Sequence, residues 1–308
     1  MKILFFGRGV IGTQYAWAFE NAGHTVEFYV RKGRKEQYGV HVNLEILDAR
    51  NKKTQFIKEE WPIVIHEDIE KNHDYDLIFV SVNPEQVSSA VTYLAPQIGN
   101  ATVLFFGNFW YDIKKSISPL PPSQVIWGFP GCGGGIEGNT LYGGFYKKVH
   151  FGTFETEPPK RESAVRKLFS RAGFKVVIHE NFQNWLRNHF VSNAAMEVEV
   201  LKSGSFKNVV SSYEALVGMA RNIKEMIPVL EAKGVKLDAM TKLMNYLPPS
   251  VVGFIMNKIV LSPKSMPYAL MEHNHYKVGY SVKVMISEAK QQGIHAPSLF
   301  AVESLIME

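Results

Sequence analysis

Cysteine and long apolar runs are scarce in this sequence. Of its 308 residues only Cys132 is a cysteine, which excludes an intrachain disulfide and favours a reducing compartment. No apolar run reaches the roughly 18 residues of a membrane-spanning helix. The first residues, "MKILFFG", are too few for the apolar core of a signal peptide. We therefore expect a cytoplasmic protein with no membrane partner.

Neither charge sign dominates. The formal net charge is +5, and the densest basic run is "RKGRK", residues 31–35. Since the chain has neither zinc-finger spacing nor an RNA-binding aromatic signature, we expect no nucleic-acid partner. The 46% of hydrophobic and 20% of charged residues are typical of a globular protein, and the length suggests about two domains.

The N-terminal half contains short apolar runs with little polar alternation. Such runs are typical of strands buried on both faces of a parallel sheet. The glycine-rich residues 129–144 break this pattern and predict loops and turns near the domain junction. We expect an α/β domain over residues 1–152, with a Rossmann-like doubly wound sheet. Its strands are expected at residues 2–6, 25–30, 77–82, 102–106 and 124–129.

The second half of the sequence changes to helical patterns. One strand is expected at residues 174–178, and the last three expected helices each end near a glycine, a common helix stop. We therefore expect a mainly helical domain over residues 153–308. Its helices are expected at residues 160–173, 181–204, 212–234 and 272–293.

The first loop of the chain, "GRGVIG", fits the pattern G-x-G-x-x-G between an expected strand and an expected helix. The first glycine permits a tight turn, the second lets the backbone approach a pyrophosphate, and the third allows close packing of helix on strand. The helix N-terminus favours anionic phosphates. We expect this loop to bind a dinucleotide. Its residues are Gly7, Arg8, Gly9, Val10, Ile11 and Gly12.

The residues after the second expected strand are basic. An NAD-binding protein usually has Asp or Glu there to accept from the ribose 2′-hydroxyl, whereas this chain has Arg31 and Lys32. A guanidinium can bind the 2′-phosphate of NADP through two charge-matched hydrogen bonds. The sequence therefore favours NADP(H) as the cofactor. The alternative interpretation is a solvated basic loop.

With these features and a helical second domain, the chain resembles the ketopantoate reductase (2-dehydropantoate 2-reductase) family over nearly its whole length. The resemblance implies NADPH-dependent reduction of a 2-keto acid by hydride transfer, a bundle-like C-terminal domain and a cleft between two domains. It is carried by the glycine loop, Arg31, "LIFVSVNPEQVSSAV", "LFFGNF", "FPGCGGGIEGNTLY", "NWLRNHFVSNAA" and a late "SM…GI" segment.

Three binding positions follow from the resemblance. Asn108 matches a family asparagine that lies beside the nicotinamide and the substrate. Ser265 matches a family serine that contacts the substrate. Asn83 stands where the family usually has a lysine that helps to hold the cofactor phosphate. Asn108 and Asn83 are therefore assigned to the cofactor, and Asn108 and Ser265 to the substrate.

The family's proton donor is a lysine four residues before an asparagine on a helix. Counting back from Asn193 gives His189, whereas counting from Trp185 gives Arg187. Trp185, His189 and Asn193 are spaced i, i+4 and i+8 and share one helix face, which Arg187 does not share. We therefore take His189 and Asn193 as candidate catalytic residues. The alternative is that His189 is a packed or capped histidine of the domain interface.

The family's late glutamate is replaced by Lys277. Either His189 and Lys277 exchange the usual roles, with Lys277 as a cation near the substrate, or the ketopantoate chemistry is altered or lost. The function that we expect is NADP-dependent reduction of a small 2-keto acid or related carbonyl compound. The alternatives are an NADPH-binding regulator or scaffold without turnover, and an opine-type dehydrogenase. The oligomeric state is left open, with a homodimer as one option.

Two further features are interpreted as structural. His273 and His275 are two residues apart, which places them on opposite sides of a helix, and no third ligand has obvious spacing. We expect no metal site. Cys132 has no histidine or acid nearby in the sequence and is interpreted as a small loop residue rather than a nucleophile.

Overall fold

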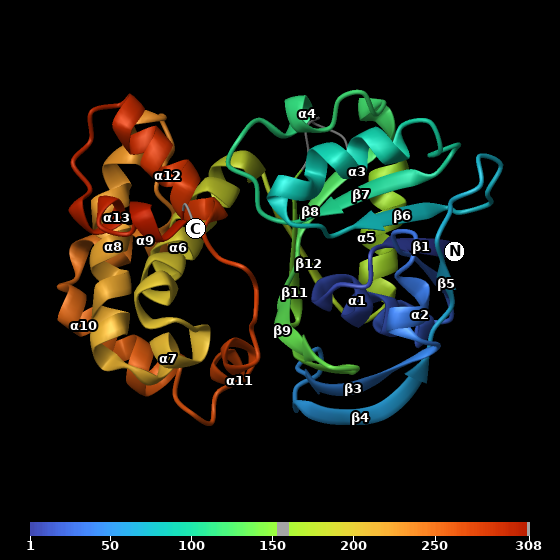
Figure 1. Ribbon diagram of the computed structural model, residues 1–308, viewed down its shortest axis with the longest axis horizontal. Helices are drawn as coiled ribbons and strands as arrows, with labels where there is room; N and C mark the ends of the chain where they lie inside the picture. The colour runs from blue at the N-terminus through green and yellow to red at the C-terminus, as the bar shows by residue number, and fades with distance from the viewer. Residues whose placement is uncertain (153–159, 307–308) are drawn as a thin grey trace. The chain divides into compact units, whose positions relative to one another are not determined.

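The computed structural model describes residues 1–152 and 160–306 and divides the chain into two compact units (Figure 1). Unit 1 comprises Met1–Gly107 and Tyr111–Phe182, and unit 2 comprises Asn108–Trp110 and Gln183–Glu308. The domain boundary was expected after residue 152. Beyond that point, helix α5 (Lys160–Arg171) and strand β12 (Lys175–His179) still belong to unit 1.

Unit 1 contains an eight-stranded sheet of order β12-β11-β8-β7-β6-β1-β2-β5. The strands from β5 to β8 in this order run parallel, β11 is antiparallel to β8, and β12 is parallel to β11. This topology confirms the expected Rossmann-like fold class. Besides β12, the strands are β1 (Lys2–Phe6), β2 (Thr25–Tyr29), β5 (Ile65–His66), β6 (Leu77–Val80), β7 (Thr102–Phe106), β8 (Val125–Phe129) and β11 (Lys148–Gly152).

The neighbouring strands β1 and β6 mark the switch point of this sheet. From β1 the chain winds to β2 on one side, whereas it returns to β6 on the other side and continues to β7. Ligands of doubly wound sheets bind outside the carboxyl ends of the strands at such a point. A ligand site is therefore expected among the residues that follow β1, β2 and β6.

Helix α1 (Val10–Glu20) lies between the large sheet and a second, smaller sheet (Figure 1). The fully buried ring of Tyr15 on α1 lies 5.7 Å from that of Phe79 in β6 and 5.7 Å from that of Phe145 in the smaller sheet, measured between centroids. The aromatic core of unit 1 is therefore built around this helix. The other helices are α2 (Lys35–Tyr38), α3 (Val87–Leu94) and α4 (Ile113–Ser116), with 3-10 turns at Pro84–Gln86 and Pro122–Gln124.

The smaller sheet corrects the prediction of loops over residues 129–144. It has the order β4-β3-β10-β9 and consists of β3 (His41–Asp48), β4 (Gln55–Pro62), β9 (Cys132–Glu137) and β10 (Thr140–Phe145). The glycines permit close packing rather than loops. A Cβ on Gly134 would lie 2.0 Å from the Tyr142 carbonyl oxygen, and one on Gly143 would lie 2.7 Å from Oε1 of Gln14 on α1.

Unit 2 is helical, as expected. Its core is formed largely by α6, α8 and α12, and Leu216, Met226 and Met285 are fully buried there. No helix in the described residues has the length and apolar character needed to cross a membrane. The helices are α6 (Phe182–Ser203), α7 (Phe206–Ser211), α8 (Tyr213–Ala232), α9 (Ala239–Tyr246), α10 (Pro249–Ile255), a π-helical turn (Met256–Val260), α11 (Met266–Glu272), α12 (Tyr280–Gln291), α13 (Pro297–Phe300) and a 3-10 turn (Glu303–Ile306).

The helix expected from residue 272 begins only at Tyr280. Gly279, which precedes it, has a φ of 122°, in a region that interrupts a right-handed helix. The buried carboxylate of Glu197 accepts hydrogen bonds from the backbone N–H groups of Gly279 at 3.0 Å and Ser281 at 3.2 Å. Residues 273–279 are therefore a connection between α11 and α12, not part of a helix.

Candidate functional site

The glycine loop has the local geometry that its sequence predicts. Gly7 has a φ of 96°, and its N–H donates to the Tyr29 carbonyl at 2.8 Å. A Cβ on Gly7 or Gly9 would meet nothing within 4 Å, so the backbone of this turn borders open space. A Cβ on Gly12 would lie 3.2 Å from Oγ of Ser81. The third glycine therefore allows close packing of helix on strand, as expected.

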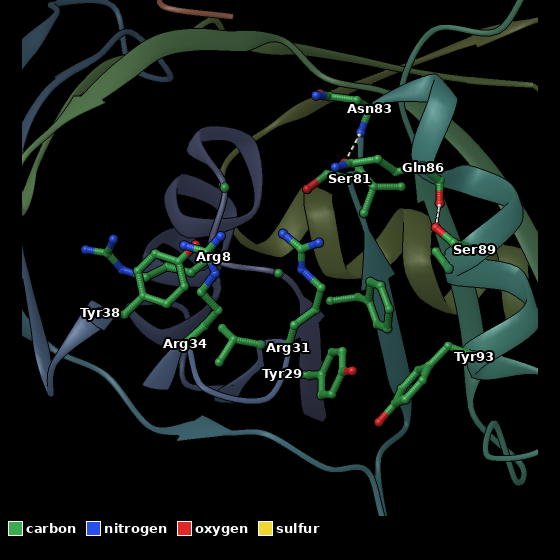
Figure 2. Close-up of a pocket in the computed structure, with 16 residues that line it drawn as sticks. Arg8, Tyr29, Arg31, Arg34, Tyr38, Ser81, Asn83, Gln86, Ser89 and Tyr93 are labelled. Atoms are coloured by element: carbon green, nitrogen blue, oxygen red, sulfur yellow. Dashed lines mark hydrogen bonds between the residues drawn. The ribbon is translucent and has the colours of Figure 1, made fainter. Parts of the chain in front are cut away.

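A cavity of about 530 Å³ opens beside this loop (Figure 2). Its volume is within the range of cofactor sites, and it lies at the carboxyl ends of β1, β2 and β6, the switch point of the sheet. Of the residues predicted to bind cofactor, Gly7, Arg8, Gly9, Arg31 and Asn83 line it. The full lining is Phe6, Gly7, Arg8, Gly9, Tyr29, Val30, Arg31, Arg34, Tyr38, Ser81, Val82, Asn83, Gln86, Ser89, Ala90 and Tyr93.

The charged residues among these lining residues are all basic. Arg8, Arg31 and Arg34 contribute to the lining, and none of the lining residues is Asp or Glu. Arg31 and Arg34 are exposed, whereas Arg8 is buried. Lys32, which the sequence argument paired with Arg31, does not line the cavity. The cavity is therefore suited to an anionic ligand.

One side of the cavity is an aromatic wall, defined as Phe6, Tyr29 and Tyr93. The sequence alone did not predict it. The ring of Tyr29 stacks on Phe6 at 4.8 Å and 29° and on Tyr93 at 4.8 Å and 24°. Burial, followed by the hydrogen bond with Tyr93, raises the pKa of Tyr29, so this phenol stays a neutral hydrogen-bonding group. No spacing rule relates residue 29 to residue 93, because the pair forms only when α3 packs beside β2.

Asn83 lies in the cavity wall but is committed to a local turn. Its side chain accepts from the backbone N–H of Gln86, and its own N–H donates to Oε1 of Gln86 at 3.2 Å, which together form a capping box. Ser81, Gln86 and Ser89 add polar groups to the same wall. Asn83 is therefore part of a neutral turn, and the positive charge of the cavity lining comes from Arg8, Arg31 and Arg34.

In unit 2, α6 presents His189 as the sequence spacing predicts. The rings of Trp185 and His189 stack at 5.5 Å with 13° between their planes, which confirms that they share a helix face. Burial lowers the pKa of His189 to about 4, and the carboxylate of Asp238 opposes this shift. The imidazole is therefore neutral at pH 7. Asn193, two turns after Trp185, is half-buried on the same helix.

Arg187, the alternative to His189, binds another part of unit 2. Its Nε donates to the Trp110 carbonyl at 3.1 Å, and Nε2 of Gln183 donates to the Phe109 carbonyl at 3.1 Å. These bonds tie the segment that starts with Asn108 to α6. Both amide atoms of Asn108 are buried and have no partner among the described residues. Because buried amides are normally hydrogen-bonded, Asn108 is suited to bind a ligand.

The remaining candidates lie around α11. The Ser265 hydroxyl oxygen caps this helix and accepts from the Tyr268 N–H at 3.2 Å. Lys277 is exposed in the connection that follows α11. His273 and His275 lie in that connection too, so the argument from opposite helix faces does not apply to them. Among residues 1–152 and 160–306, no group of three or more His, Cys, Asp or Glu side chains could hold a metal ion.

Comparison with known proteins identifies the family to which the first half of the chain is similar. Residues 3–155 match the family model of ketopantoate reductase PanE/ApbA. The N-terminal half of the chain belongs to the ketopantoate reductase family. The matched stretch contains the glycine loop, Arg31 and every residue of the cavity lining. No sequence among the curated proteins matches the chain.

Solved structures share the ketopantoate reductase fold along the whole chain. 2-Dehydropantoate 2-reductase from Geobacter metallireducens GS-15 has a TM-score of 0.71 and 15% identity, covering 100% of this chain and 99% of that one. D-Mandelate dehydrogenase, solved with NADH and anilino(oxo)acetate, has a TM-score of 0.69 and 16% identity, with coverages of 100% and 97%. A dimeric ketopantoate reductase from Staphylococcus aureus has a TM-score of 0.67 and 13% identity, with coverages of 100% and 98%.

Proposed function

We propose that this protein is an NADP-dependent oxidoreductase that reduces a small 2-keto acid or a related carbonyl compound. The observation that carries the proposal is the cavity beside the glycine loop, which is lined by three arginines and no acid. A family match over the same residues supports the reaction class. D-Mandelate dehydrogenase and the reductase from Geobacter metallireducens, which have this fold, are both named for the chemistry of 2-hydroxy or 2-keto acids.

The phosphate-bearing form of the cofactor is favoured by the end of β2. Arg31 and Arg34 reach the cavity from there, and both are exposed enough to meet a ligand that enters from solvent. A 2′-phosphate would accept charge-assisted hydrogen bonds from either guanidinium. An unphosphorylated ribose would find no carboxylate among the lining residues to accept from its 2′-hydroxyl.

The residues of unit 2 are assigned to the substrate. When bound, the nicotinamide supplies the hydride that reduces the carbonyl carbon. Asn108, with its unpartnered amide, would bind the substrate together with Asn193 and Ser265. The oxygen of the reduced carbonyl must then gain a proton, for which His189 and Lys277 are the candidates.

The first experiment is a screen of 2-keto acids, ketopantoate included, that follows NADPH absorbance. Oxidation of NADPH with one of these acids supports the proposal. Tight binding of NADPH without oxidation by any carbonyl compound would favour the second candidate, a cofactor-binding regulator. The neutral ring of His189 and the exposed position of Lys277 are the observations that keep this second candidate open.

The proton donor is tested once a substrate is found. We expect His189→Ala to lower kcat by roughly 10²–10⁴-fold with little change in NADPH affinity, the usual scale for a general acid. Because the pKa of His189 is about 4, its protonated fraction grows as the pH falls, and kcat/KM should rise toward low pH. Full activity and an unaltered pH profile in His189→Ala would assign the proton to Lys277, and Lys277→Ala would then show the loss.

Two further properties belong to this proposal. The single thiol, Cys132, lies inside unit 1 at the start of β9, and burial raises its pKa. A half-buried thiol with a raised pKa forms little thiolate, which is compatible with the cytoplasmic location that we propose. We also propose a homodimer, by analogy with the dimeric reductase from Staphylococcus aureus. Light scattering on the purified protein tests the dimer directly, because a monomeric mass would exclude it.

A further inference from the structure

Arg8 is a buried cation in the middle of the glycine loop. It is only 4% exposed, yet in the described part of the chain no carboxylate pairs with it. Its partners are neutral: Nη2 donates to Oδ1 of Asn139 at 2.8 Å, and the guanidinium lies over the Tyr38 ring at 5.1 Å. The Nε atom is buried and has no acceptor among the residues that the structure describes. Burial accordingly lowers the pKa of Arg8.

The smaller sheet holds this guanidinium in place. Asn139 lies in the turn between β9 and β10, and its Nδ2 donates to the His41 carbonyl at 3.0 Å. Its backbone carbonyl accepts from the Asn43 N–H at 3.0 Å. The amide that receives Arg8 is therefore fixed by β3, while Tyr38 from α2 covers the guanidinium. Figure 2 shows Arg8 and Tyr38 on the side of the cavity away from Tyr93.

We propose that Arg8 is the counterion of the cofactor diphosphate, and that Asn139 is its positioning residue. The inference rests on the proposed function. An unpaired charge in a low-dielectric surrounding is costly, and a bound anion removes that cost. Arg8 belongs to the same turn whose backbone and helix N-terminus attract phosphate. A diphosphate bound to this turn would bring its negative charge next to the guanidinium.

This assignment gives the three arginines of the cavity separate tasks. Arg31 and Arg34 follow β2 and would meet the 2′-phosphate, which NADPH has and NADH lacks. Arg8 would meet the diphosphate, which both cofactors have. Substitution of Arg8 should therefore weaken every ligand with a diphosphate, whereas substitution of Arg31 should weaken only ligands with a 2′-phosphate.

The test measures the affinity of four probes by calorimetry: NADPH, NADH, ADP-ribose and adenosine 2′-monophosphate. For Arg8→Met we expect a loss of at least about tenfold for the first three, the scale of a charge-assisted bond, and less than about twofold for the monophosphate. Arg31→Gln should weaken NADPH and adenosine 2′-monophosphate, which carry the 2′-phosphate, and leave NADH and ADP-ribose unchanged. Arg221→Gln removes an exposed arginine of α8 in unit 2 and serves as the control, with all affinities unchanged.

The positioning role is tested by Asn139→Ala. This variant should show the same selective loss as Arg8→Met, and the double variant should lose no more than Arg8→Met alone. Without cofactor, Arg8→Met should have a melting temperature equal to or higher than that of the native protein, because the substitution removes a buried unpaired charge. If that variant does not fold, Arg8→Lys replaces it, and we expect it to bind the diphosphate probes less tightly than the native protein does.

The outcomes separate this inference from the proposed function. Native protein that binds neither NADPH nor NADH would overturn the proposed function itself. Native protein that binds both, together with an Arg8 variant that binds them equally well, would overturn only the role of Arg8. An equal loss for adenosine 2′-monophosphate would also overturn it, because the guanidinium would then not act on the diphosphate.

Discussion

At the scale of single residues, the neighbours Arg31 and Lys32 show how little sequence position reveals about a site. Both follow β2 and both are exposed, but only Arg31 lines the cavity. Both residues lie beyond the end of β2, where no strand geometry sets the direction of a side chain, so only the fold decides which cation reaches the cavity. Variants of the two residues can therefore be compared directly, because Arg31 lines the cavity and Lys32 does not.

Cofactor preference follows from this pair. We expect NADPH to bind at least tenfold more tightly than NADH, a difference of about 1.4 kcal/mol. Arg31→Gln should reduce that preference, because it removes one of the two arginines that would meet the 2′-phosphate, whereas Lys32→Gln should leave it intact. Fluorescence titration of both cofactors checks this. Equal affinities in the native protein, or equal losses in both variants, would contradict it.

His189 makes stability depend on pH. Its pKa is about 4 in the folded protein and about 6.5 when unfolded. Above pH 6.5 the ring is neutral in both states and contributes nothing. As the pH falls from 6.5 toward 4, only the unfolded state gains the proton, so the folded state loses stability. By pH 5 the expected loss is about 2 kcal/mol.

Urea unfolding at pH 7 and pH 5 measures this loss. His189→Gln should lose about 2 kcal/mol less than the native protein between the two pH values, since glutamine does not titrate. An identical pH dependence in the variant would show that the His189 ring gains its proton equally in the folded and unfolded protein. That result would also contradict the alternative interpretation of His189 as a packed histidine.

At the scale of secondary-structure elements, the smaller sheet decides the shape of unit 1. Strand β10 pairs in parallel with β3, which precedes it by almost 100 residues, and antiparallel with its neighbour β9. Two glycines of this hairpin, Gly134 in β9 and Gly143 in β10, have no room for a side chain and permit this arrangement. The turn of the same hairpin contains Asn139, which holds Arg8 at the cavity.

Gly134 tests the sheet. A Cβ there would lie 2.0 Å from a backbone carbonyl oxygen, and its φ is 128°. We expect Gly134→Ala to cost more than about 3 kcal/mol, because backbone must move to relieve the clash. Gly138→Ala is the matched control, since Gly138 has a φ of 59° and nothing within 4 Å. It should cost only about 1 kcal/mol.

Thermal unfolding of both glycine variants gives the comparison. A large drop in melting temperature is expected for Gly134→Ala and a small one for Gly138→Ala. Similar melting temperatures for the two variants would show that the strand can shift away from the added methyl group, and that close packing at Gly134 does not define the hairpin.

At the scale of the whole molecule, the chain has the family fold, and we expect its chemistry to differ from that of a standard ketopantoate reductase. His189 and Lys277 stand where the family resemblance implies a lysine and a glutamate. We expect kcat/KM for ketopantoate to be at least about 100-fold below that of a standard ketopantoate reductase assayed in parallel, the scale for a missing general acid. The double variant His189→Lys, Lys277→Glu should raise it. Native turnover equal to that of the standard enzyme would contradict this expectation.

Much of unit 1 was predictable from local pattern. The apolar runs at β1, β2, β6, β7 and β8 indicate strands buried on both faces, and the glycines at residues 7, 9 and 12 have the conformations or contacts that their spacing implies. These properties depend on neighbours close in the chain, so a sequence reveals them. The stacking of Trp185 on His189 was predictable for the same reason, because one helical turn brings the two rings together.

The tertiary structure decided what depends on distant partners. Loops were predicted where β9 and β10 form, because glycine by itself weakens a strand. Only the packing of α1 and β3 against these two strands explains why glycines occur in them. The helix expected from residue 272 starts later, because Glu197 on α6 binds the backbone at Gly279. The burial of Arg8 also depends on distant partners, because its neighbours in the sequence do not indicate it. Its charge becomes informative only when the fold surrounds it with Tyr38 and Asn139, while no carboxylate of residues 1–152 and 160–306 pairs with it.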